Sequence, residues 1–371
     1  MPNIIPVTMP KFGLAMTEGK VAAWLKKIGE PVKVGDEIAD IETTKITNAY
    51  ESPVAGVLRR LVAPEQQDLA VGALIAVVAD ETTTDTDIDA FVEKFQADFT
   101  TQAAAVRETA PEPQTVQLGD RTIRYLETGI GNSGTPVLLI HGFSGDLNNW
   151  MFTQPALSEI HRVIALDLPG HGGSSKHVGN ADVATFANIL CDFLSALGIA
   201  KPHLVGHSLG GAVALRAALD DPGRAASLTL IAPAALGPEI DDDFIRDFIA
   251  AGRRKQLEPV AAKLVADPAL ISRDMLEDLL RFKRLDGVTQ ALTAISAANF
   301  EGGQHEILRE RLPALSNLPV QIIWGTEDRI IPPRHAQGLP SNISVHLIPG
   351  AGHLPHMEKA AEVNRLLSAF I

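Results

Sequence analysis

A junction between two structural patterns at Gly206-His207-Ser208-Leu209-Gly210 leaves this chain few folds to choose from. The preceding run HLVG (203–206) is typical of a buried strand, and the following GAVALRAAL is typical of a helix. A serine in such a turn takes a strained backbone conformation, and the flanking glycines remove Cβ atoms that would collide there. The pattern therefore predicts a strand, a tight turn and a helix, with Ser208 as a nucleophile whose oxyanion faces the helix N-terminus.

The partners of this serine are expected later in the chain, first an acid and then a histidine. WGTEDRIIP follows an apolar strand run and places Asp328 on the next loop. Glu327 is the neighbouring alternative, but the turn imposed by IIPP suits Asp328 better. GAGHLPHMEK follows the last strand run and offers His353 on a glycine-rich loop. We therefore predict a catalytic triad of Ser208, Asp328 and His353.

Two backbone amides are predicted to form the oxyanion hole. One belongs to Leu209, the residue after the nucleophile, and the other to Phe143, in the His-Gly-Phe loop that follows the strand run PVLLI. His141 in that loop is interpreted as a structural residue. His207 is interpreted as a packing or hydrogen-bonding residue, and His356 as a surface or supporting imidazole. None of these three histidines is predicted to be the base.

The rest of the chain from about residue 115 alternates apolar runs with helical patterns. Such runs, buried on both faces, indicate a parallel sheet wrapped by helices. The segment from about 237 to 315 has no strand-like run and is predicted to be a helical cap. The predicted strands are PVLLI (136–140), RVIAL (162–166), HLVG (203–206), LTLIA (228–232), VQIIW (320–324) and SVHLI (344–348).

This arrangement resembles the α/β-hydrolase superfamily over residues 115–371. The landmarks LIHGF, ALDLPGHGGS (165–174), GHSLGG and GAGH occur in the superfamily's order. The resemblance implies the α/β-hydrolase fold with a helical cap. It does not specify the substrate, because this fold carries many chemistries.

Residues 1–79 have a different pattern, with short apolar runs cut by Gly and Pro every 8–12 residues, which predicts a small all-β domain. Residues 80–114 are interpreted as a linker holding one amphipathic helix. We expect the apolar stripe of this helix to dock on the hydrolase-type domain or on a second subunit. The flanking segments ETTTDTD and RETAPEPQ would then be the hinges. The stripe consists of Ile88, Phe91, Val92, Phe95 and Phe99.

A lysine lies between two strand-like runs in Glu42-Thr43-Thr44-Lys45-Ile46. This context resembles the lipoyl domain of 2-oxo acid dehydrogenase complexes, in which a lysine on an exposed β-turn carries a lipoyl arm. Thr44 departs from the usual pattern, which has Asp before the lysine. Biotinyl domains have Met on both sides of the lysine, and this chain does not. The resemblance implies covalent lipoate on Lys45, and the alternative is an ordinary exposed lysine.

A lipoyl-type domain joined to a hydrolase-type domain suggests that the triad acts on what the carrier brings. The chain lacks the HxxxDG motif of the usual transacylases, since its only Asp-Gly pair is Asp286-Gly287. The combination resembles the dihydrolipoamide acetyltransferase component of acetoin dehydrogenase systems. That resemblance implies acetyl transfer from the lipoyl arm to CoA, with a thiamine-diphosphate-dependent acetoin-cleaving enzyme and a lipoamide dehydrogenase as partners. The alternatives are a thioesterase or esterase, and a non-catalytic scaffold of a multienzyme complex.

The net charge and the hydropathy of the chain restrict the classes of partner and the location that we expect. The net charge of −13 argues against nucleic acid binding, and no metal site is expected. No apolar stretch reaches the length of a membrane span, and the N-terminus has no signal-peptide pattern, so a cytoplasmic location is expected. An oligomer is compatible with the sequence.

Two basic clusters, Arg253-Arg254-Lys255 and Arg281-Phe282-Lys283-Arg284, either bind the CoA phosphates or are solvated helix faces.

Overall fold

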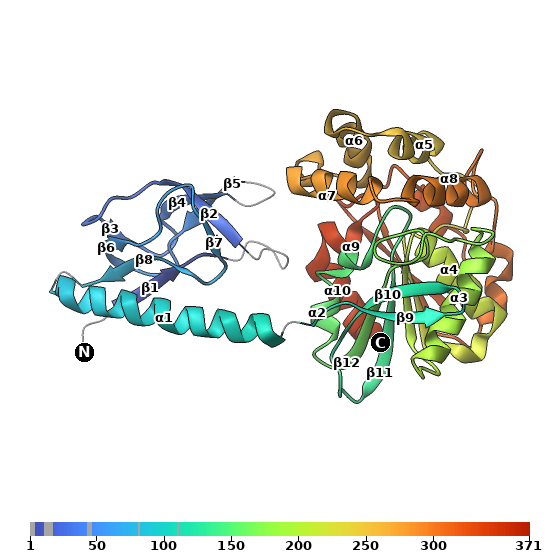
Figure 1. Cartoon of the computed structure of the whole chain (residues 1–371), viewed down its shortest axis with the longest axis horizontal. Helices are drawn as coiled ribbons and strands as arrows, with labels where there is room; N and C mark the ends of the chain where they lie inside the picture. Colours follow the sequence, from blue (N-terminus) through green and yellow to red (C-terminus); the bar gives the residue numbers. More distant parts are fainter. Residues whose placement is uncertain (1–3, 11–17, 43–46, 81, 110) are drawn as a thin grey trace. The chain divides into compact units, whose positions relative to one another are not determined.

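The computed structural model of this protein describes residues 4–10, 18–42, 47–80, 82–109 and 111–371. The chain divides into two compact units, Met1–Ala110 and Pro111–Ile371. Each unit has its own hydrophobic core. The secondary-structure labels used below are those of Figure 1.

The described part of the first unit contains two four-stranded antiparallel sheets. One sheet has the order β1 (Ile4–Thr8), β8 (Leu74–Ala79), β6 (Gly56–Leu61) and β3 (Pro31–Val32). The other has the order β5 (Thr47–Glu51), β4 (Glu37–Glu42), β2 (Glu18–Trp24) and β7 (Asp68–Ala70). Alternate side chains of both sheets meet in one core, because successive residues of a strand point to opposite faces. The core includes Val7, Val21, Ile41, Leu58 and Val78.

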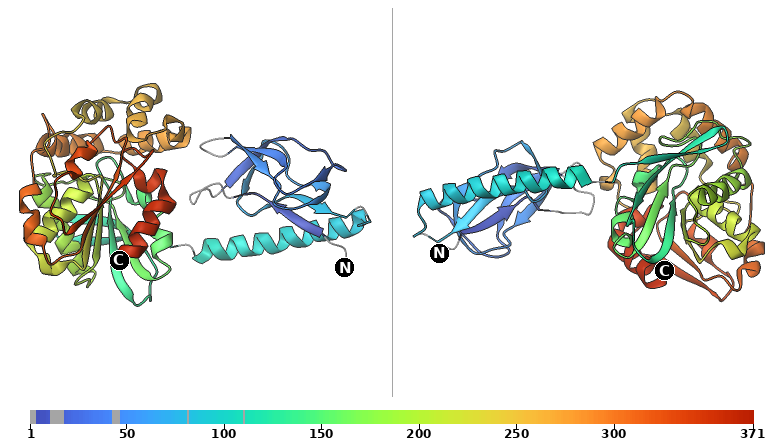
Figure 2. Two further views of the ribbon diagram at one scale, coloured as in Figure 1. Left: turned by 180° about the vertical axis from the view of Figure 1, so that it is seen from behind. Right: turned by 60° about the horizontal axis from the view of Figure 1, so that its bottom comes forward.

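The helix predicted in the linker is α1 (Asp85–Thr109), and it packs on the first unit itself. Phe91 and Phe95 form a cluster with Leu74 and Val77 of β8, and Figure 2 shows α1 running along this unit in both views. The expectation that the stripe docks on the hydrolase-type domain or on a second subunit is therefore wrong. The physical reason is the short connection from β8, which returns the helix to the adjacent sheet before it reaches another surface.

Polar contacts fix the start of the same helix. Arg59 and Arg60 of β6 form ion pairs with Asp85 and Asp89, at 3.3 and 2.5 Å. The Arg59 guanidinium also donates to the carbonyl of Asp80, at 2.8 Å. Asp85, in the ETTTDTD segment that was expected to be a hinge, is thus held against the sheet.

The second unit is built on an eight-stranded sheet with the order β16-β15-β14-β13-β11-β12-β10-β9. The two strands at one end, β9 (Gln114–Leu118) and β10 (Arg121–Thr128), are antiparallel to their neighbours, and the other strands are parallel. The six predicted strands all form, and they are β11 (Gly134–Ile140), β12 (His161–Leu166), β13 (His203–His207), β14 (Ser227–Ile231), β15 (Val320–Gly325) and β16 (Ile343–Ile348).

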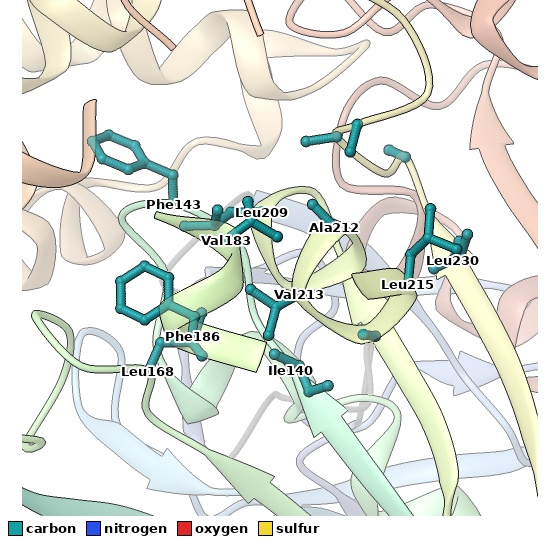
Figure 3. Close-up of a cluster of buried hydrophobic side chains, with 14 of the residues drawn as sticks. Ile140, Phe143, Leu168, Val183, Phe186, Leu209, Ala212, Val213, Leu215 and Leu230 are labelled. Atoms are coloured by element: carbon teal, nitrogen blue, oxygen red, sulfur yellow. The ribbon is translucent and has the colours of Figure 1, made fainter. Parts of the chain in front are cut away.

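Both faces of this sheet are buried, which explains the continuous apolar runs. In β11, Leu138 and Ile140 join the large core that includes α3 (Val183–Ala196) and α4 (Leu209–Asp220). Val137 and Leu139 point to the opposite face, where they join the core that includes α10 (Ala360–Phe370). Figure 3 shows part of the first core, with Ile140 of β11 lying beside Val213 of α4.

The segment predicted as a cap lies between β14 and β15 and is helical. Figure 1 shows its helices gathered at one end of the sheet. Phe248 of α5 and Phe300, which follows α8, contact Phe143 in the loop after β11, so the cap covers the carboxyl ends of the parallel strands. The cap helices are α5 (Asp242–Ala250), α6 (Arg254–Ala261), α7 (Arg273–Lys283) and α8 (Val288–Asn299).

Candidate active site

Ser208 lies in the tight turn between β13 and α4. Its backbone has φ 53° and ψ −118°, a region that residues with a Cβ rarely adopt, and its side chain is buried. A Cβ atom at Gly206 would lie 2.3 Å from the carbonyl oxygen of Gly210, and one at Gly210 would lie 2.3 Å from that of Ile140. The two glycines are therefore required for the turn, as the sequence pattern predicted.

The predicted acid and histidine meet at the same end of the sheet. Asp328 follows β15 and His353 follows β16, and His353 Nδ1 donates to Asp328 Oδ2 at 2.7 Å. Trp324 Nε1 donates to the same oxygen at 2.9 Å. The backbone amides of Ile330 and Ile331 donate to Asp328 Oδ1, at 2.8 and 3.0 Å. Four donors thus fix the carboxylate, which in turn fixes the imidazole through its Nδ1.

His207 connects the turn that carries Ser208 (the serine turn) to the loop between β16 and α9 that carries His353 (the histidine loop). Its Nε2 donates to the carbonyl oxygen of His353 at 2.8 Å, and the two rings lie 4.8 Å apart between centroids. Burial holds the pKa of His207 well below its usual value, and the neighbouring imidazoles lower it further. His207 is therefore neutral, and the hydrogen of its ring N–H is on Nε2. This contact brings the loop that carries His353 against the turn that carries Ser208.

His356 is fully buried, so of its two interpretations the surface residue is excluded and the supporting imidazole fits. Its ring lies between those of Trp150 and His207, at centroid distances of 4.8 and 4.7 Å. The preceding Pro355 begins the short helix α9 (Pro355–Glu358). Pro355 and His356 are the buried residues of this helix, so the imidazole points into the protein. His356 supports the ring that holds the histidine loop.

The two amides predicted for the oxyanion hole are both available. Among the described residues, neither the Phe143 nor the Leu209 backbone N–H has a hydrogen-bond acceptor. A Cβ atom at Gly142 would lie only 2.9 Å from the Cβ of Ser208, so the loop that carries Phe143 lies directly against the serine turn. Figure 3 shows the Phe143 side chain pointing away from α4. Its ring packs against Phe248, which leaves the amide on the side of the serine turn.

His141 holds this loop, as expected of a structural residue. Its Nε2 accepts the Leu168 amide at 3.0 Å, so its hydrogen is on Nδ1, which donates to the Gly142 carbonyl at 2.7 Å. Burial lowers its pKa, although the charge of Asp167 opposes that effect. The neutral imidazole therefore locks the carbonyl next to the predicted oxyanion donor.

Sequence reasoning missed Asp167, which anchors the loops beside the site. Its fully buried carboxylate accepts the backbone amides of Leu147 and Gly173, at 2.8 and 2.7 Å, and pairs with Arg124 at 3.1 Å. The signal was available, because Asp167 lies inside the ALDLPGHGGS landmark. Glu358, which accepts backbone amides on both sides of His353, was missed as well.

The predicted carrier lysine, Lys45, lies outside the described residues. The strands on either side of it are described, and Glu42 at the end of β4 pairs with Thr47 at the start of β5. Within the described ranges, no group of three or more His, Cys, Asp and Glu side chains is arranged to hold a metal ion. None of the helices in those ranges combines the length and apolar content that a bilayer crossing requires.

Fold and site together define the second unit as an α/β-hydrolase-type domain with a serine in its nucleophile turn. The family model described as "alpha/beta hydrolase fold" matches residues 135–360, and the model described as "Biotin-requiring enzyme" matches residues 5–78. A solved serine hydrolase from the polyaromatic hydrocarbon-degrading bacterium Cycloclasticus zankles covers 70% of this chain and 98% of its own, with a TM-score of 0.63 and 24% identity. The predicted fold class is confirmed for both units.

Two curated relatives match the whole chain. A protein of Pseudomonas putida is 47% identical over 372 residues, covering 100% of this chain and 99% of its own. One of Cupriavidus necator is 43% identical over 367 residues, covering 99% and 97%. Both are named dihydrolipoyllysine-residue acetyltransferase component of acetoin cleaving system. The chain belongs to this family, and the predictions of an acyltransferase and of a lipoyl-type domain are confirmed.

Proposed function

We propose that this protein transfers an acetyl group from a lipoyl arm on Lys45 to CoA during acetoin cleavage, with Ser208 as the nucleophile. The observation that carries the proposal is the Asp328–His353 hydrogen bond beside a strained serine turn, in the same chain as a lipoyl-type domain. A hydrolase acting alone has no need of a carrier. The names of the two full-length relatives support the same reaction.

Acylation of Ser208 starts with the proton of its hydroxyl, which passes to His353 Nε2 as Oγ attacks the thioester carbonyl. Asp328 keeps the imidazole in the tautomer that can accept this proton. The Phe143 and Leu209 amides hold the negative oxygen, and losing one such donor typically raises a barrier by about 3–4 kcal/mol. The carbon–sulfur bond then breaks, and His353 returns the proton to the leaving thiolate.

Deacylation uses the same groups in reverse. His353 takes the proton of the CoA thiol, whose sulfur attacks the carbonyl of acetyl-Ser208. The Ser208 Oγ–carbonyl bond breaks, and the proton returns from His353 to Oγ. One thioester replaces another, so the step needs neither an oxidant nor a reductant.

The first unit is suited to present a carrier group. The Glu42–Thr47 pair leaves a four-residue connection between two antiparallel strands, and Lys45 is in that connection. When bound there, lipoate would supply a dithiol that carries the acyl group as a thioester. In general, a carrier group has to lie on an exposed connection so that separate enzymes can reach it.

The reaction requires two partners, whose classes follow from the chemistry. One must load the acyl group onto the arm, and a thiamine-diphosphate-dependent acetoin-cleaving enzyme would do so. The other must reoxidise the dithiol that transfer leaves behind, and a lipoamide dehydrogenase would do so. The names of both full-length relatives assign those proteins to an acetoin cleaving system, which supports this choice of partners.

Hydrolysis of the acyl-enzyme is the second candidate reaction, because the solved structures that share this fold include serine hydrolases. The cap argues for transfer. The rings of Phe248 and Phe300 cover the Phe143 side chain at centroid distances of 6.2 and 6.1 Å, which reduces the access of water to the loop beside Ser208. A non-catalytic scaffold is the third candidate, and it would not need the four donors that hold Asp328.

The test is a product assay with acetyl-dihydrolipoamide, with and without CoA. The proposal expects acetyl-CoA with CoA present and little acetate without it. Ser208→Ala should lower the rate by a factor on the order of 10⁴ or more, whereas Ser341→Ala, at an exposed position, should not. Acetate as the main product in both conditions would favour the hydrolase, and full activity of Ser208→Ala would reject the nucleophile.

A further inference from the structure

Glu358 lies at the end of α9. Its carboxylate accepts hydrogen bonds from the histidine loop and from the cap segment Leu264–Ala266. Oε1 accepts the backbone amides of Gly352 and Leu354, at 2.8 and 3.2 Å. Oε2 accepts the amide of Ala266, at 2.7 Å. Partial burial raises the pKa of Glu358, so this half-buried carboxylate depends on those donors to stay charged. Among the described residues it has no Lys or Arg within ion-pair distance.

The amides that Glu358 accepts from the histidine loop flank His353 on both sides. The amide of His353 itself donates to the carbonyl of Leu264, in the cap, at 2.9 Å. Three successive amides of the loop, 352 to 354, are therefore bonded, two to Glu358 and the middle one to the cap. The backbone that carries the imidazole has no free donor left in this stretch.

The cap segment Leu264–Ala266 touches the same loop directly. A Cβ atom at Gly352 would lie 2.8 Å from Ala266 N and 2.8 Å from the carbonyl carbon of Val265. Only a glycine permits this approach of one backbone to the other. One oxygen of Glu358 thus holds the histidine loop, and the other holds the cap segment packed against it.

We propose that Glu358 is a positioning residue that couples the cap segment Leu264–Ala266 to His353. This inference rests on the proposed function, because it assigns His353 as the group that moves the proton of Ser208. A misplacement of a reacting group by about 1 Å can cost roughly a hundredfold in rate, so a loop that must place Nε2 needs such a restraint. The cap segment cannot withdraw without disturbing the backbone of His353.

Two substitutions break the coupling from opposite sides. Glu358→Gln keeps the shape but replaces one acceptor by an NH₂ group, so it can accept from the loop or from Ala266 but not from both. Ala266→Pro removes the N–H on the cap side. Val265 has φ −122° and ψ 153°, which is the extended conformation that a residue before proline adopts. Glu362→Gln, at an exposed position of α10, is the matched control.

The measurement is kcat and KM for acetyl-dihydrolipoamide and CoA, with melting temperature as the control for folding. We expect each variant to lower kcat roughly tenfold while both KM values change by less than about twofold. The double variant should be no slower than Glu358→Gln alone, because both changes break the same contact. The Glu362→Gln control should match the unaltered protein.

An unchanged kcat in either variant, or fully additive losses, would overturn the inference. A fall in melting temperature with an unchanged kcat would assign Glu358 a structural role only. If Glu358→Gln does not fold, Ala266→Pro decides alone by the same kcat criterion. Loss of activity in Ser208→Ala with normal kcat in the Glu358 variant would reject this inference alone, whereas an active Ser208→Ala would reject the proposed function itself.

Discussion

His356 is a buried titratable group whose energetics can be measured apart from catalysis. Burial lowers its pKa from 6.5 to about 3, and His353 contributes to that shift. The unfolded chain regains the ordinary pKa and therefore binds more protons than the folded chain between those two values. The free energy of unfolding must then fall as the pH drops below the ordinary value.

We predict that His356→Phe, which keeps an aromatic ring but cannot titrate, reduces this pH dependence. Between pH 7 and 5 the unaltered protein should lose about 2 kcal/mol more unfolding free energy than the variant. Chemical denaturation of the second unit, followed by the fluorescence of its tryptophans, gives both values. The same loss in both proteins would show that His356 is not the group responsible.

The residues of the proposed triad could be located in the sequence because each one follows a recognisable strand run in a fixed order. Several groups that support them could not, because their partners are backbone atoms far away in the sequence. His207, for example, reaches the carbonyl oxygen of His353 across 146 positions. Glu358 reaches Ala266 across 92 positions. Such contacts depend on how loops meet at the end of the sheet, and no local pattern records that.

The parallel strands were predictable because each is a short, continuously apolar run in an alternating strand and helix pattern, and the cap was predictable because its segment has no such run. β9 and β10 were not predicted, although β10 alternates buried and partly exposed residues along RTIRYLET. Alternation of that kind marks a half-buried antiparallel strand and could have revealed it. The docking of α1 was predicted on the wrong surface, because an apolar stripe shows that a helix packs but not where.

The stripe of α1 should therefore stabilise the first unit. We predict that replacing Phe91, Phe95 and Phe99 by Ser lowers the unfolding free energy of that unit by about 3 kcal/mol or more, since each ring is partly buried. Transfer from free acetyl-dihydrolipoamide should be unchanged. Serine at the exposed Glu93, Gln96 and Asp98 of the same helix is the control. Equal stability of the two triple variants would mean that the stripe does not hold α1 on the sheet.

The two basic clusters in the cap differ in how many of their charges are paired, since within the described residues Arg284 is the one cation of the second cluster that is exposed and forms no ion pair. Arg281 pairs with Asp278 at 2.9 Å, and Lys283 donates to the carbonyls of Phe248 and Ala251. Arg253, Arg254 and Lys255 are exposed, and none of them forms an ion pair within the described part of the chain. The first cluster in the sequence is therefore the better candidate for the CoA phosphates.

We predict that changing Arg253, Arg254 and Lys255 to Ala raises the KM for CoA roughly tenfold, because charge-assisted contacts to phosphate are lost. The KM for acetyl-dihydrolipoamide should remain unchanged, and Arg281→Ala should affect neither constant. Steady-state kinetics with each substrate varied in turn provides the comparison. An equal rise in both constants for the triple variant would exclude specific CoA binding by this cluster.

The molecule as a whole joins a carrier unit to a catalytic unit in one chain. A tethered acyl group meets the site at a millimolar effective concentration when the connection can span the distance. Lys45→Arg should therefore abolish transfer driven by the acetoin-cleaving partner, yet leave transfer from free acetyl-dihydrolipoamide within about twofold. Intact mass should show one lipoyl addition in the unaltered protein and in Lys33→Arg. A lipoyl mass that survives Lys45→Arg would contradict the assignment.

The acyl-enzyme itself is the most direct test of the claim that Ser208 passes the acetyl group on. The protein is mixed with acetyl-dihydrolipoamide without CoA, quenched, digested and analysed by mass spectrometry, and a parallel sample receives CoA before quenching. We predict one acetyl group on the peptide that contains Ser208, which disappears on addition of CoA as an equal amount of acetyl-CoA forms. Acetyl-CoA produced without acetylation of Ser208, or loss of the acetyl group as acetate when CoA is present, would contradict the account.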